Sequence, residues 1–118
     1  MQLKALRLFK NIYLYRHSVD MRKYRSGLCT IVDLELGINL YTDSLFVFSN
    51  RRQTIIRFLY WDATGFAVWT KTLEKSRYRW PRIFGGDVSK KLSYQNLEKI
   101  LLGMDITPHK KLGFKKVS

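Results

Sequence analysis

Apolar residues form three runs in the middle of the chain, and polar breaks separate them. The runs cover residues 45–48, 54–61 and 66–73, and β-branched and aromatic residues dominate them. Runs of this kind, bounded by turn residues, are typical of strands joined by hairpins. Basic and aromatic residues then alternate over residues 77–80 as far as Pro81, which cannot donate to a strand ladder. The pattern predicts an antiparallel meander of three or four strands that ends at Pro81.

The second break, at residues 62–65, reads Asp-Ala-Thr-Gly. Aspartate at its start and glycine at its end favour a type I turn followed by a bulge, with Gly65 at a positive φ. In the 66–73 run that follows, alternation places Val68 on one face and Trp69 on the other. Neither face is purely polar, so we expect the sheet to be covered on both sides at one end.

The segment before the meander predicts a strand and then a helix. Residues 12–15 suit a short first strand, and Asp20 stands where a helix N-cap is expected. Gly37 is suited to end this helix. Apolar residues recur between these points at helical spacing. They are Met21, Tyr24, Leu28, Ile31 and Val32.

The segment after the meander predicts a second helix, which would pack on the sheet. Ser93 is a suitable N-cap, and Gly103 lies near the expected end. The apolar stripe between them consists of Tyr94, Leu97, Ile100, Leu101 and Met104. The predicted fold class is therefore α+β: an antiparallel β-meander of about four to five strands with two or more packed helices. We expect one domain over residues 1–118, with its core at 12–105 and a basic tail at 106–118 that becomes ordered only against a partner.

The charge balance points to an anionic partner. Lysine and arginine number 22 against 9 aspartates and glutamates, which gives a net charge of +13. A charge of this size repels itself unless a polyanion is near. Nucleic acid is the first candidate, an anionic membrane surface the second and an acidic protein the third. A basic surface without any ligand stays an alternative.

Other classes of protein are disfavoured by what the chain lacks. Cys29 is the only cysteine, and His17 and His109 lie far apart, so the usual zinc patterns are absent. Cys29 suits a small core residue, and both histidines suit the surface. No apolar run approaches the roughly 18 residues of a membrane span, and the N-terminus does not resemble a secretory signal. We expect a cytoplasmic protein with no membrane partner.

No catalytic constellation is recognisable. The nine acidic residues are scattered, whereas a metal-dependent nuclease needs converging carboxylates. Asp20, Asp62 and Glu74 are the conceivable set, but a helix cap, a turn and an ion pair with Lys71, Lys75 or Arg77 explain them better. No phosphate-binding loop or nucleophile motif is present. We therefore expect no enzymatic activity, no cofactor and no metal, and keep a small nuclease as the third hypothesis.

The basic positions favour nucleic-acid binding. Alternation over residues 77–80 would put the two arginines on one face for phosphate and the aromatic rings on the other for the core. Trp61, Trp69 and Trp80 could stack on bases, but we expect them in the core. The candidate nucleic-acid-binding residues are Arg51, Arg52, Arg57, Lys71, Lys75, Arg77, Arg79 and Arg82.

An ordered set of short motifs resembles a known family. The motifs include Asp-Met-Arg-Lys at residues 20–23, Arg51-Arg52, Leu-Tyr-Trp-Asp at 59–62, and Arg77-x-x-Trp80-Pro81. Together with Leu-Leu-Gly-Met-Asp at 101–105, they resemble the TnpB-type accessory proteins of bacterial insertion elements of the IS-sixty-six type, over about residues 12–105. Two departures are a family Lys at the position of Arg57 and a lost charge at Thr72.

The resemblance implies an accessory factor that helps transposition beside a separate DDE-type transposase, with no enzymatic activity assigned. It also implies a bacterial cytoplasm, where association with the nucleoid stays open. Our leading hypothesis is a non-catalytic protein that binds DNA, with element ends as the ligand; RNA stays open. The alternative is a protein–protein adaptor that docks on the transposase or a sister accessory protein. Its candidate residues, from the family motifs, are Asp20, Arg22, Lys23, Trp80 and Pro81.

Overall fold

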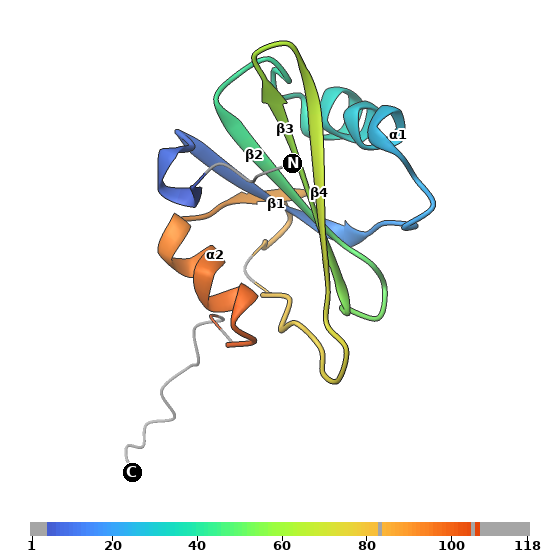
Figure 1. Ribbon diagram of the computed structural model, residues 1–118, viewed down its shortest axis with the longest axis vertical. Coiled ribbons are helices and arrows are strands. Elements are labelled where there is room, and N and C mark those ends of the chain that lie inside the picture. The colour runs from blue at the N-terminus through green and yellow to red at the C-terminus, as the bar shows by residue number, and fades with distance from the viewer. Residues whose placement is uncertain (1–4, 83, 105, 107–118) are drawn as a thin grey trace.

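The computed structural model describes residues 5–82, 84–104 and 106, and shows a five-stranded sheet with helices on both faces (Figure 1). The order of strands across the sheet is β4-β3-β2-β1-β5. The strands are β1 (Asn11–Ser18), β2 (Ser44–Ser49), β3 (Ile55–Asp62), β4 (Gly65–Thr72) and β5 (Ser89–Lys91). The helices are a 3-10 turn η1 (Leu6–Leu8), α1 (Arg25–Thr30), a π-helical turn η2 (Ile31–Leu36) and α2 (Tyr94–Leu101).

The predicted meander is confirmed only for β2, β3 and β4, which pair antiparallel in sequence order. The first strand instead pairs parallel with β2, with Ile12 opposite Leu45. The sheet is therefore mixed, and the prediction of a purely antiparallel meander is wrong. The physical reason lies in the connection: residues 19–43 contain α1 and η2, and a helical crossover of that length returns the chain to the same end of the sheet.

The expected last strand at residues 77–80 is also absent. After β4, the Leu73 N–H donates to the Thr54 carbonyl at 2.7 Å, and the Tyr78 N–H donates to the Gln53 carbonyl at 2.7 Å. These bonds tie an irregular loop to the turn between β2 and β3. The predicted alternation of burial nevertheless holds, because Tyr78 is buried while Arg77 and Arg79 are exposed.

Both faces of the sheet are covered, as expected. On one face α2 contributes Leu97 and Ile100 to a core with Leu14, Val47 and Phe58. On the other, α1 and η2 pack over a second core that includes the following buried residues: Leu28, Val32, Phe46, Phe48 and Leu59. Figure 1 shows α1 and α2 on opposite sides of the strands. Every residue of β2 is buried, which fits a central strand between two cores.

All three tryptophans are half-buried; Trp69 and Trp80 pack against a core, as expected, whereas Trp61 packs against neighbouring surface rings. Trp69 stacks on Phe58 with ring centroids 5.0 Å apart. Trp61 contacts the rings of Tyr41 and Phe66. Trp80 is partly buried against the core under α2. The prediction of a core position therefore holds for Trp69 and Trp80 but not for Trp61.

The helix ends confirm two of the predicted signals and correct one. Ser93 caps α2 by accepting the Asn96 N–H at 3.1 Å. Gly37 ends η2 with φ at +64°, a conformation that glycine adopts without strain. Asp20 is not the N-cap of α1, because that helix begins only at Arg25. Its carboxylate instead accepts the Arg22 backbone N–H at 2.9 Å, which forms a local turn.

The turn between β3 and β4 also differs from the prediction. Asp62 pairs with Gly65, so the loop contains two residues and Ala63, not Gly65, has a positive φ of 53°. This two-residue loop fixes the hairpin register, which sets Phe58 opposite Trp69. In the part of the chain that the structure describes, no helix has the length and apolar character needed to cross a membrane.

Candidate nucleic-acid interface

Three loops meet at one end of the sheet, which we call the basic end. They are residues 19–24 after β1, residues 50–54 between β2 and β3, and residues 73–82 after β4. They meet because β1 is parallel to β2, whereas β3 runs opposite to both β2 and β4. Figure 1 shows the β2–β3 turn beside the loop that follows β4. The fold thus collects the segments that the sequence singled out.

Backbone hydrogen bonds hold the three loops together. The Val19 N–H donates to the Ser49 carbonyl at 2.8 Å, and Leu73 and Tyr78 donate to the β2–β3 turn as described above. Within that turn, Asn50 Oδ1 accepts the backbone N–H groups of Thr54 and Ile55, each at 2.9 Å. A turn fixed in this way presents its side chains in a defined geometry.

The β2–β3 turn brings Arg51 and Arg52 to the segment after β1. Both arginines are exposed, and with Asp20 and Met21 they line a pocket of about 450 Å³. The Arg-Arg pair and the Asp-Met-Arg-Lys motif, far apart in sequence, are therefore neighbours in space.

A second pocket of about 390 Å³ at the same end contains Arg82 together with Gln53, Trp80 and Pro81. Its wall also includes Arg16, an exposed residue near the end of β1 that sequence reasoning missed. Alternation alone did not reveal its exposure, because Arg16 shares a sheet face with buried Leu14; the only available signal was its charge.

The remaining predicted cations are exposed on or just after β4. They are Lys71, Lys75, Arg77 and Arg79. Lys71 lies opposite Ile56 on the face of the sheet that carries α2. Arg57 follows Ile56 in β3, so its side chain lies on the opposite face of the sheet, the face that carries α1. The basic residues therefore surround one end of the sheet, and Arg57 and Lys71 do not share a face.

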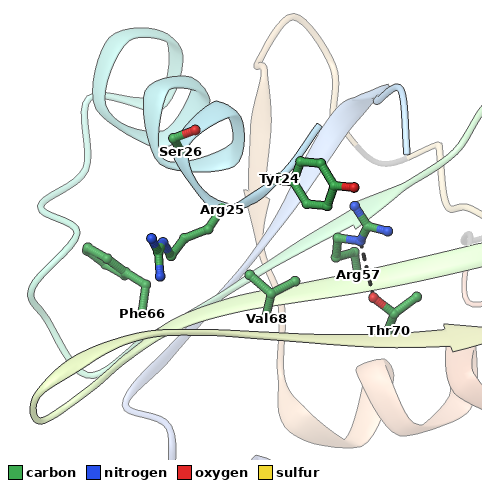
Figure 2. A pocket seen from close by; sticks show the side chains of 7 residues that line it. All are labelled: Tyr24, Arg25, Ser26, Arg57, Phe66, Val68 and Thr70. Atoms are coloured by element: carbon green, nitrogen blue, oxygen red, sulfur yellow. Dashed lines mark hydrogen bonds between the residues drawn. The ribbon is translucent and has the colours of Figure 1, made fainter. Parts of the chain in front are cut away.

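Arg57 is half-buried and makes contacts of its own. Its Nη1 donates to the carbonyl oxygens of Met21 at 2.9 Å and Lys23 at 2.7 Å, and its Nε donates to Thr70 Oγ1 at 3.2 Å. Figure 2 shows the bond to Thr70. The guanidinium thus fastens the turn after β1 to β3 and β4, a structural role that the sequence did not suggest.

The candidate partner-binding residues divide into an exposed and a structural group. Arg22 Nη2 lies 2.7 Å from Asp20 Oδ2, and both side chains, like Lys23, are exposed. Hydrogen bonds from the Arg22 side chain and backbone lower the pKa of Asp20 to about 2. In contrast, the Trp80 Nε1–H donates to the Tyr15 carbonyl at 3.0 Å, and Pro81 is buried.

Other titratable side chains that the structure describes have packing or hydrogen-bonding roles. Burial raises the pKa of the Cys29 thiol, which suits a packing role. Burial also raises the pKa of Tyr15, whose hydroxyl donates to Glu35 Oε1 at 2.7 Å. Among the residues that the structure describes, no three His, Cys, Asp or Glu side chains are grouped for a metal. Asp62 ends β3 at the opposite end of the sheet from Asp20.

The prediction of a basic tail falls largely outside the residues that the structure describes. The basic tail from residue 107 onward, including His109, lies outside the described residues. His17 is exposed, as expected, and its ring contacts that of Tyr15 at a centroid distance of 5.6 Å.

Comparisons with known proteins agree with the motif resemblance. A family described as "IS66 Orf2 like protein" matches residues 10–111. The chain is 30% identical over 98 residues to "Uncharacterized protein y4jC" of Sinorhizobium fredii (strain NBRC 101917 / NGR234), covering 83% of this chain and 82% of that protein. It is 31% identical over 86 residues to "Uncharacterized protein y4hO" of the same strain, covering 73% of each chain. No solved structure matches it. The chain therefore belongs to the family of IS66 Orf2-like proteins, which are accessory proteins of insertion elements.

Proposed function

We propose that this chain is a non-catalytic accessory protein that assists DNA transposition by binding element DNA through the basic end. One observation carries the proposal: three loops distant in sequence place exposed cations around one end of a rigid sheet. Loop cations at this end include Arg51, Arg52, Arg77 and Arg79. A net charge of +13 supplies the long-range attraction to a polyanion.

The second candidate is an adaptor that docks on the transposase. The exposed Asp20–Arg22 pair supports it, because a pre-formed ion pair can present a fixed donor and acceptor pattern to a protein. In that case, co-purification with the transposase survives nuclease treatment and high salt, and Arg22→Ala weakens it. Co-purification that nuclease abolishes favours DNA as the link.

The test of DNA binding is an anisotropy titration of a labelled element-end duplex at several salt concentrations. The unaltered protein should bind at low salt, with a log–log slope that steepens by about 0.9 for each phosphate contact. The double variant Arg51→Ala/Arg52→Ala should flatten this slope by about two units if both arginines contact phosphate.

A charge-matched control separates a local effect from a general one. Lys10 and Lys91 are exposed, and they lie near the start of β1 rather than at the basic end. Lys10→Ala/Lys91→Ala removes the same charge and should leave the slope close to that of the unaltered protein. Equal losses in the two double variants, or no binding at low salt, would rule out the basic end as the interface.

A further inference from the structure

A pocket on the α1 side of the sheet adjoins the basic end. It has a volume of about 560 Å³, within the roughly 300–1,000 Å³ of small-ligand sites. Figure 2 shows it between the start of α1 and the strands β3 and β4. The residues that line it include Tyr24, Arg25, Arg57, Phe66, Val68 and Thr70.

The wall of this pocket contains a positive charge with only neutral hydrogen-bond partners. The Arg57 guanidinium donates to two backbone carbonyls and to the Thr70 hydroxyl. Within the described residues, no carboxylate pairs with it. A half-buried cation without a counter-ion favours an anion nearby. Arg25 supplies a second guanidinium, and in Figure 2 the two groups lie on either side of Val68.

The rest of the pocket is apolar and aromatic. The Tyr24 ring stands at its rim with 80% of its surface exposed, so a ligand can reach the ring. Phe66 and Val68 are half-buried and supply apolar surface from β4. An exposed aromatic ring beside cations is the combination on which single-stranded nucleic acids stack.

We propose that this pocket binds an unpaired nucleotide, with the base against Tyr24 and the apolar surface of β4 and the phosphates at Arg25 and Arg57. The inference rests on the proposed function and deepens it. A base paired within a duplex has its faces covered by its neighbours, so it cannot use Tyr24. An acidic peptide would satisfy the two arginines but leave the ring and the apolar surface without a contact.

The experiment compares two labelled single strands that carry the same phosphates. One is a short oligothymidylate, and the other has abasic sites in place of the bases. The unaltered protein should bind the base-bearing strand about tenfold more tightly, in line with aromatic stacking of one base. Tyr24→Ala should abolish this preference, and Tyr24→Phe should keep it. Tyr94→Ala, at an exposed tyrosine on α2, is the matched control and should also keep it.

The outcomes separate this inference from the proposed function. Equal affinity of the unaltered protein for both strands overturns the nucleotide pocket, and so does a preference that Tyr24→Ala leaves intact. Neither result affects duplex binding through the basic end. Failure of the duplex titration, in turn, removes the proposed function itself. A comparison of oligouridylate with oligodeoxyuridylate, which differ only in the 2′-hydroxyl, shows whether the site is selective for DNA, because equal binding means that the sugar is not recognised.

Discussion

Arg57 and Lys23 lie 34 residues apart in sequence, yet the Arg57 guanidinium donates a 2.7 Å hydrogen bond to the Lys23 backbone carbonyl. A second bond of 2.9 Å reaches the Met21 carbonyl. These two contacts attach the turn after β1 to the central part of β3. The turn contains the Asp-Met-Arg-Lys motif, so the position of that motif depends on a side chain from another strand.

Replacement of Arg57 should therefore reduce stability, because these hydrogen bonds are lost. Arg57→Met leaves two carbonyl oxygens without their donor, and we expect the free energy of unfolding to fall by about 1–3 kcal/mol. Arg57→Lys should cost less, because an ammonium can still donate to the same carbonyls although it lacks the planar fork. Urea unfolding followed by circular dichroism measures both values.

The control for this prediction is Arg52→Met, which removes an exposed arginine at the β2–β3 turn. A surface change of this kind should alter the free energy of unfolding by less than about 0.5 kcal/mol. If Arg57→Met and Arg52→Met behave alike, the hydrogen bonds from Arg57 do not hold the turn in solution.

The antiparallel part of the sheet was predictable because its signals are local. The three apolar runs at residues 45–48, 54–61 and 66–73 match β2, β3 and β4 closely, and Ser93 marks the start of α2. The parallel position of β1 was not predictable from its own residues, because strand direction is set by the partner and the connection. Only the length of the helical crossover before β2 could have indicated it.

The basic residues of the candidate site were predictable from the sequence, but their arrangement in space was not. The basic motifs are visible in sequence, whereas their meeting at one end depends on the sheet topology. A phosphate-binding role for Arg57 was predictable from its charge, whereas its bonds to backbone carbonyls were not, because such acceptors leave no mark in a sequence. Partner contact at Trp80 was predicted from its family motif, whereas its bond to the Tyr15 carbonyl was not predictable for the same reason.

The Asp20–Arg22 contact should be visible in a pH titration. The Arg22 hydrogen bonds lower the pKa of Asp20 from its ordinary 3.8 to about 2 in the folded protein. A lowered folded-state pKa means that the contribution of this contact is fully present above about pH 4 and is lost as the pH falls through about 2. The measurement is the NMR chemical shift of the Asp20 carboxyl carbon, followed from roughly pH 1.5 to 6, a range that covers this window.

A neighbouring arginine provides the control for that titration. Arg22→Ala removes the charged donor, so the pKa of Asp20 should return most of the way to its ordinary value. Arg25→Ala removes the same charge three residues further on and should leave the pKa of Asp20 low, because no hydrogen bond joins these two side chains. An Asp20 pKa near 4 in the unaltered protein would show that the ion pair does not form in solution.

Trp80 tests whether the family motif at residues 77–81 serves the fold or a partner. Trp80→Phe keeps an aromatic ring but loses the 3.0 Å bond to the Tyr15 carbonyl, so the free energy of unfolding should fall by about 0.5–1.5 kcal/mol. Trp61→Phe is the matched control, because no described residue accepts a hydrogen bond from its indole, and its cost should be smaller.

Since the Trp80 bond joins the loop after β4 to β1, it acts within the chain. Trp80→Phe should therefore leave the affinity for transposase and for duplex DNA unchanged at temperatures where the variant is folded. A large loss of transposase affinity without a loss of stability would instead place the Trp80 ring in a partner interface.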